Sequence, residues 1–196
     1  MFNQVGDDRD HQGMRIPKED SFYGRGYERP VYFINGESQQ RGKFMNNTTG
    51  TSSTAGKFSA VFAFADKLYE TDSVFRKTGM KKGYYGLAMS ALNYALKKPG
   101  VTQTVSVKSP YIYAEENYVD DLELACAAIH DMVLHAKGSG SDNGHYLMLA
   151  LNYARQEKIT PWLGADTAKH YQWYPFINLG HYEIIRQMSE RDHSPH

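Results

Sequence analysis

Aromatic side chains stand in the irregular parts of this sequence, where their rings could stack on a ligand. The chain has 15 Tyr, 9 Phe and 2 Trp in 196 residues, and many of the tyrosines lie close to Gly, Pro or Asn. Such rings combine an apolar face with a polar edge, which suits stacking on sugar rings and suits protein interfaces equally well. The aromatic loops are therefore compatible with sugar binding and with a protein interface.

Acidic side chains gather in the first turn of an expected helix, at Asp120, Asp121 and Glu123. Negative charge at the positive end of a helix dipole is stabilising, which is a sufficient structural reason for these residues.

The histidines and the single cysteine do not form a recognisable metal motif. His130 with His135, and His170 with His181, lack the spacing of a zinc-binding helix, so we expect surface or loop positions for them. Cys126 falls within a helical apolar pattern and is expected to be a small buried side chain.

The composition favours an ordinary globular protein. Hydrophobic residues make up 41%, and 22 basic residues balance 22 acidic ones, so we expect no nucleic-acid partner. No apolar run approaches the roughly 18 residues of a membrane span. Met1–Asp10 is polar, so we expect any secretion signal to lie upstream of this sequence.

Apolar residues recur at helical spacing in five segments. These are Thr51 to about Thr71, Tyr84 to about Leu96, a segment from Val119, His145 to about Gln156, and a last helix that carries Phe176, Ile177, Gly180, Ile184 and Met188. In the first segment, Ser52, Ser53 and Thr54 are expected N-caps. Its expected inner face holds Ala55, Phe58, Phe62, Ala65 and Tyr69, and the fourth helix is expected to turn Leu149 and Tyr153 inward.

Long irregular stretches separate these helices. Met1–Asn47 is rich in Gly and Pro, with one expected short strand at Pro30–Ile34, and Val101–Tyr113 is expected to be extended. Helix, long loop and helix in repetition predict an all-α fold of antiparallel helical hairpins, in which the loops gather at one end. This is the pattern of an (α/α) helical-hairpin barrel, or toroid.

Several motifs occur in an order that resembles glycoside hydrolase family 9. They are V-G-D-D-R-D-H at Val5–His11, R-I-P-K-E-D at Arg15–Asp20, E-R-P-V-Y at Glu28–Tyr32, the small-residue helix Thr51–Ala65, E-N-Y-V-D-D-L-E-L-A-C-A-A-I-H at Glu116–His130, and the segment Thr160–Tyr182. Each motif alone is weak, but together they cover nearly the whole chain in the expected order.

The resemblance implies a cellulase-like enzyme that cleaves β-1,4-linked glucans with inversion. Inversion uses two carboxyl groups about 6.5–9.5 Å apart. In the family the base comes from a D-A-G-D motif upstream and the acid is a Glu near the domain's C-terminus; neither segment occurs here, so no catalytic residue is assigned. Residues 1–196 would then be part of one incomplete catalytic domain, with a groove segment (1–50), helical hairpins (51–190) and a frayed tail (191–196). The parent protein is expected to be secreted or periplasmic.

The resemblance also suggests which residues contact the polysaccharide or oligosaccharide substrate. Asp10 and His11 match a D-H pair at the floor of the family's groove, although a polar pair that only orders a loop would look the same. Four aromatic residues are expected sugar platforms, namely Trp162, Tyr171, Trp173 and Tyr174. An alternative interpretation of Trp173 is that it is the first residue on the buried face of its helix.

No cofactor is required by the implied chemistry, but some members of the family hold a structural Ca²⁺. Glu116, Asn117, Asp120 and Asp121 match the positions of its ligands, and hard oxygen donors suit this ion. Asp121 stands where the family has the longer Glu, and acids at a helix start need no metal, so both interpretations stay open.

Two other functions remain alongside the hydrolase. One is a carbohydrate-binding or structural helical-repeat module without catalysis, and the other is a helical-barrel enzyme for a different glycan.

Overall fold

The structure is a computed structural model, and it describes residues 1–5, 31–41, 44–77, 83–104, 115–137, 144–156 and 178–192. Six helices make up most of these residues. The helices are α1 (Ser52–Thr71), α2 (Ser73–Lys77), α3 (Tyr84–Lys97), α4 (Val119–Lys137), α5 (His145–Ala154) and α7 (Leu179–Asp192). The expected all-α class is confirmed for these residues. None of the helices in these ranges has the length and apolar character needed to cross a membrane.

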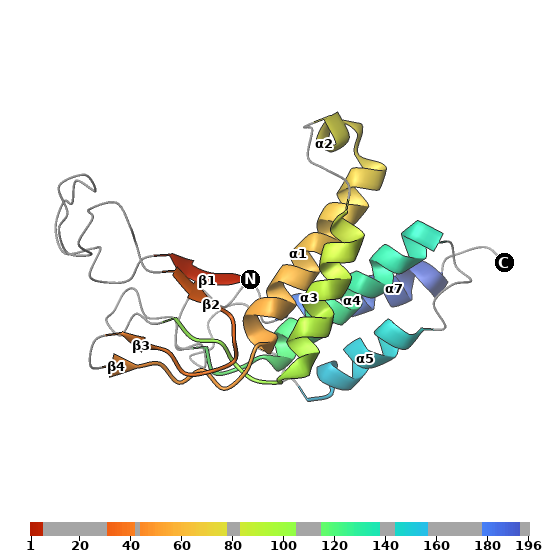
Figure 1. Ribbon diagram of the computed structural model, residues 1–196. Helices are drawn as coiled ribbons and strands as arrows, with labels where there is room; N and C mark the ends of the chain where they lie inside the picture. The colour runs from red at the N-terminus through yellow and green to blue at the C-terminus, as the bar shows by residue number, and fades with distance from the viewer. Residues whose placement is uncertain are drawn as a thin grey trace, which may run out of the picture.

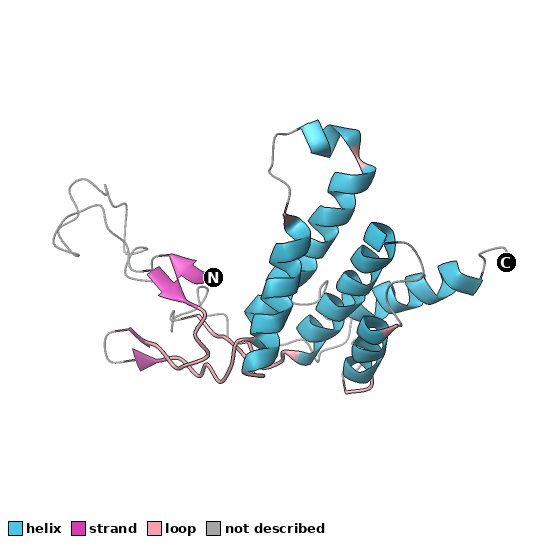
Figure 2. Cartoon of the chain, turned by 45° about the vertical axis from the view of Figure 1, so that its right-hand side comes forward, coloured by secondary structure: helices cyan, strands magenta, loops and turns pink. Residues whose placement is uncertain are grey.

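Four short strands lie beside the start of α1 (Figures 1 and 2). They are β1 (Phe2–Val5), β2 (Val31–Phe33), β3 (Gln40–Arg41) and β4 (Phe44–Met45). β1 pairs with β2 and β3 with β4, both antiparallel. The strand expected within Pro30–Ile34 is confirmed as β2. The other three were not expected, because strands of two to four residues show too little alternation to be recognised.

Helices α1 and α3 form an antiparallel hairpin. The Ser52 hydroxyl donates to the carbonyl of Ala95, and the Ser59 hydroxyl donates to that of Ala88, so the two helices run in opposite directions. The chain crosses itself at the start of α1, where a Cβ on Gly50 would lie 2.5 Å from Cα of Gly100. Only glycine allows this approach.

The expected N-capping of α1 by serine and threonine side chains is wrong. Thr51 holds the N-cap position without a side-chain bond to the helix. The first amides are instead satisfied by the crossing chain, since Ser52 N–H and Ser53 N–H donate to the carbonyl of Gly100. Both serines are fully buried, and their hydroxyls bond to the α3 side of the hairpin. Tertiary contacts replace a local cap.

Three helices run parallel to one another. Lys57 pairs with Asp121 and Lys67 with Asp131, so α1 and α4 keep the same sequence offset of 64 residues along their length. On the other side of α4, His181 pairs with Glu123 and, further along, Arg186 pairs with Asp131, which makes α7 parallel to α4 as well. α5 follows α4 after a short connection and packs against it. The result is a row of hairpins in which α1, α4 and α7 lie side by side.

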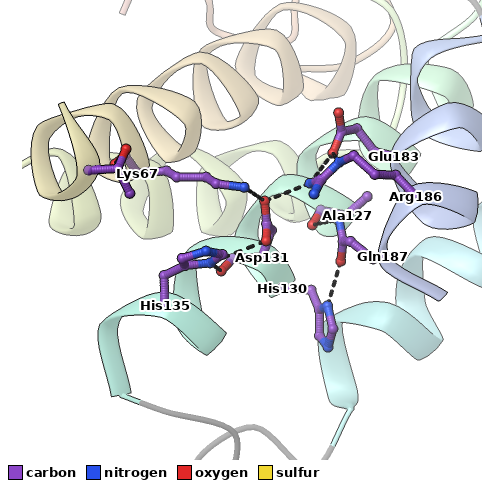
Figure 3. A network of polar contacts seen from close by, with 9 residues as sticks. Lys67, Ala127, His130, Asp131, His135, Glu183, Arg186 and Gln187 are labelled. Atoms are coloured by element: carbon purple, nitrogen blue, oxygen red, sulfur yellow. Dashed lines mark hydrogen bonds and ion pairs between the residues drawn. The ribbon is translucent and has the colours of Figure 1, made fainter. Parts of the chain in front are cut away.

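Asp131 joins all three parallel helices (Figure 3). Its Oδ2 receives Lys67 Nζ of α1 and an Arg186 nitrogen of α7, each at 2.7 Å. Arg186 also binds Glu183 at 2.7 Å, and the His135 ring lies 3.3 Å from the other Asp131 oxygen. These five residues are called the Asp131 cluster below.

Small residues, rather than the expected rings, form the fully buried face of α1. Ala55, Gly56, Ser59, Ala60 and Ala63 are buried, whereas Phe58 and Phe62 are half-buried. α1 lies between α3 and α4, and only small side chains let helix axes approach on both sides. In the same way, the buried residues of α5 are Leu147 and Ala150, while Leu149 and Tyr153 pack at the edge of the core.

The remaining helix boundaries mostly follow the expectation. α3 and α4 begin at the expected residues, and Cys126 is fully buried on α4 as predicted. α7 begins only at Leu179 and continues to Asp192, further than expected, and Phe176 and Ile177 lie outside the described residues. The histidine prediction is wrong for His130, which is fully buried and bonds to Gln187 at 2.6 Å.

Candidate functional site

The parallel helices α1, α4 and α7 all start at the end of the molecule where the strands lie. We call this the loop end; it comprises residues 46–53, 100–104, 115–121 and 178–181. Three aligned helix starts bring the positive ends of three helix dipoles to one side of the molecule. The loop end is therefore the place where these residues favour negative charge.

Gln103 ties the segments of the loop end together. Its side-chain amide donates to the carbonyl of Glu115 at 2.9 Å and accepts from the amide of Asn47 at 3.1 Å. Its own carbonyl accepts from the side chains of Asn3 and Asn46. One residue thus connects the N-terminal strand, the approach to α1 and the approach to α4.

A cluster of carboxylates shares one lysine at the start of α4. Lys57 Nζ lies 2.6 Å from Glu115 Oε2 and 2.9 Å from Asp121 Oδ2. The Asp121 side chain is 5% exposed, that of Glu115 is 21% exposed, and that of Lys57 is 43% exposed. Asp120 is buried next to them. Acidic groups outnumber the basic group in this cluster.

The charges of this cluster shift its proton affinities. Burial raises the pKa of Asp121 well above its usual range, and Lys57 offsets this only in part, because Asp120 and Glu115 add negative charge. Burial alone would lower the pKa of Lys57, but the charges of Asp121 and Glu115 raise it. A buried carboxyl group with a raised pKa is a frequent mark of a functional site, although structural networks also produce it.

A second acid–base pair lies on the other side of α4. The Glu123 side chain is fully buried, and its Oε1 lies 2.7 Å from His181 Nδ1 of α7. Gly180 makes the approach possible, because a Cβ there would lie 2.7 Å from Glu123 Cγ. His181 therefore belongs to a helix contact and not to the surface or loop role expected for it.

An apolar hollow of about 280 Å³ lies on the α1–α3 hairpin, lined by Met1, Phe62, Leu87, Ser90, Ala91 and Tyr94. Among the described residues that line it, the side chains are apolar apart from Ser90 and Tyr94, and the Tyr94 hydroxyl donates to the carbonyl of Ile34. Its lining suits packing rather than acid–base chemistry.

Comparison with protein-family models, curated proteins and solved structures finds no match to this chain.

The residues predicted as sugar contacts fall outside the described part of the chain. These are Asp10, His11, Trp162, Tyr171, Trp173 and Tyr174. The four predicted calcium ligands are described and lie close together, but they do not share one role. Asn117 Oδ1 accepts the amide of Val119 at 3.0 Å, Glu116 is exposed, and Asp120 and Asp121 are buried. Within the described ranges, no group of three or more His, Cys, Asp or Glu side chains has the geometry to hold a metal ion.

Sequence reasoning missed Lys57, Gln103, Glu115 and the Glu123–His181 pair. One signal was present, since Lys57 is a charged residue inside the small-residue stretch of α1, where it must meet a partner. The matching offset of 64 residues in Lys57–Asp121 and Lys67–Asp131 could not be seen before α1 and α4 were known to be neighbours.

Proposed function

We propose that this chain is part of an (α/α) helical-barrel glycoside hydrolase domain that acts on β-1,4-glucan-type polysaccharides with inversion. The observation that carries the proposal is the row of parallel helices α1, α4 and α7, whose N-terminal ends and loops gather at one end. The motifs that resemble glycoside hydrolase family 9 imply a barrel of helical hairpins, and we infer that this row is one part of it.

Both edges of the row carry exposed apolar side chains, which supports continuation into a closed barrel. Tyr182, Ile185 and Met188 follow one exposed face of α7 at spacings of three residues. At the other edge, Val61 of α1 and Leu87 of α3 are exposed. Further hairpins packed on these faces would remove them from water.

The described carboxylates serve as structural groups in this proposal. Glu115 and Asp121 both pair with Lys57, which gives each of them a structural partner. We therefore assign the catalytic acid and base to none of the described residues. The predicted contribution of this chain is the glycan-facing end, with Asp10, His11 and the aromatic residues Trp162, Tyr171, Trp173 and Tyr174 as the expected sugar contacts.

The test compares this chain with the full product of its gene. We expect the 196-residue chain to release little or no sugar from cellohexaose, and the longer product to cleave it with inversion, as followed by the anomeric proton signals. In the longer product, His11→Ala should lower kcat/KM about tenfold through a lost hydrogen bond to the sugar. His145→Ala, an exposed change on α5, is the matched control.

Two outcomes would contradict this proposal in different ways. Binding of cellohexaose without turnover in the longer product would favour the non-catalytic carbohydrate-binding module instead. Rapid hydrolysis by the 196-residue chain would show that its own acids carry the chemistry, with Asp10, Asp120, Asp121 and Asp166 the first to test.

A further inference from the structure

The predicted calcium ligands do not fit a bound metal ion while Lys57 keeps its position. Calcium needs about six to eight oxygens at about 2.3–2.6 Å. Of the four residues, Asn117 already uses its side-chain oxygen to hold the Val119 amide at the start of α4. Glu116 is exposed and precedes Asn117 in the sequence, whereas the buried residues Asp120 and Asp121 follow it. Only Asp120 and Asp121 remain as buried donors.

The best of these donors is already bound to a cation. Lys57 Nζ lies 2.9 Å from Asp121 Oδ2 and 2.6 Å from Glu115 Oε2, so it occupies the space between the two carboxylates. A divalent ion bound to the same oxygens would lie within a few ångströms of this ammonium. Like charges at about 4 Å repel strongly in a partly buried site. The ion and the ammonium therefore exclude one another.

The backbone brings Lys57 to this position. Gly56 packs directly on α4, where a Cβ would lie 2.9 Å from the carbonyl oxygen of Asp121. This close approach places the neighbouring Lys57 side chain within reach of both carboxylates. Its four-carbon stem spans the helix contact while part of the side chain stays in water.

We propose that the ammonium of Lys57 takes the place of a structural metal ion at the start of α4. It neutralises Asp121 and Glu115 and joins the approach to α4 to helix α1. Since Gln103 binds the carbonyl of Glu115, this internal cation also positions the connection between the α1–α3 hairpin and α4. The loop end is then independent of calcium, and Lys57 is a positioning residue.

The experiment measures thermal unfolding of the whole chain in EDTA and in about 10 mM CaCl₂. Wild type should give the same midpoint in both. Lys57→Gln, which removes the charge and ends one atom short of the lysine nitrogen, should melt lower in EDTA and gain about 3 °C or more in calcium, as a site with a Kd near 1 mM would. The double variant Lys57→Gln/Asp121→Asn should lose this gain.

Lys67→Gln is the matched control, because it removes the other lysine bridge between the same two helices. It should melt lower than wild type without any calcium response. A wild-type midpoint that falls in EDTA and returns with calcium would overturn the proposal, as would a Lys57→Gln variant that ignores calcium. If Lys57→Gln does not fold in EDTA, Lys57→Arg decides, because it must fold and be calcium-independent; a calcium requirement in that variant overturns the proposal.

Discussion

Two lysine–aspartate bridges connect α1 to α4, and they differ in the charges around them. At the loop end, Lys57 alone serves Asp121 and Glu115, with Asp120 beside them. In the Asp131 cluster, Lys67 and Arg186 both bind Asp131, and Arg186 also binds Glu183. One bridge has too few cations for its carboxylates, and the other has as many cations as carboxylates.

The pKa values follow this difference. Burial raises the pKa of Asp121, since one shared lysine does not compensate for it. Burial would also raise the pKa of Asp131, but the hydrogen bonds and charges of Lys67 and Arg186 lower it below its usual value. Two aspartates at equivalent positions of one helix pair thus have opposite roles. The ion pairs of the Asp131 cluster stabilise the ionised carboxylate of Asp131, while burial at the loop end favours the protonated form of Asp121.

Asp131→Ala should have the largest effect, because it leaves Lys67 and Arg186 without their shared partner. Breaking a buried ion pair from one side costs about 3–5 kcal/mol, and we expect about 2–4 kcal/mol here because both cations are partly exposed. Urea unfolding measures the change. Lys98→Ala, which removes the exposed pair with Glu37, is the control and should cost at most about 1 kcal/mol. Equal losses in the two variants would remove the special role of Asp131.

Gly56→Ala should have an intermediate effect, since the new methyl group would meet the Asp121 carbonyl at the loop end. Overpacking of this kind costs about 1–3 kcal/mol, more than the helix propensity of alanine returns. Gly86→Ala on α3 is a matched control, because a Cβ there meets nothing within 4 Å. It should stabilise the chain by about 0.5–1 kcal/mol. Two alanine variants that both stabilise would contradict the close α1–α4 approach.

The pH dependence should distinguish the two aspartates by sign. The lowered pKa of Asp131 gives stability that is present above about pH 4 and is lost as the pH falls through its folded pKa. In Asp131→Asn, the free energy of unfolding should therefore fall less steeply than in wild type as the pH drops below about 4. The raised pKa of Asp121 gives stability that is present at low pH and is lost as the pH rises above about 4.

Asp121→Asn consequently should compare more favourably with wild type at pH 7 than at pH 4. Denaturant unfolding of the three proteins between about pH 3 and pH 8 provides the measurement. If both variants deviate from wild type in the same direction with pH, the two bridges do not differ in the way described above.

Helix positions could be predicted from the sequence because α3 and α4 have regular apolar spacing and clear starts. The contacts between helices could not be predicted in the same way. The buried face of α1 consists of small residues, whose spacing carries little hydrophobic signal. Its serines were expected to cap the helix locally, but the crossing chain at Gly100 satisfies the amides instead.

The candidate site shows the same limit. Asp120 and Asp121 were recognised as chemically interesting, but their partner Lys57 lies far away in the sequence. An acidic helix start has the same appearance in a sequence whether a metal ion, a lysine or the helix dipole compensates its charge. Only the packing of α1 on α4 distinguishes these cases.

We propose that the loop end, and not the Asp131 cluster, faces the glycan. The most direct test is a nuclear magnetic resonance titration of the chain with cellohexaose. The account predicts that signals of the side-chain amides of Asn46, Gln103 and Asn117 shift, while the Arg186 Nε–H signal of the Asp131 cluster stays unchanged. Shifts confined to Arg186 and its neighbours, or no shifts at millimolar cellohexaose, would contradict it.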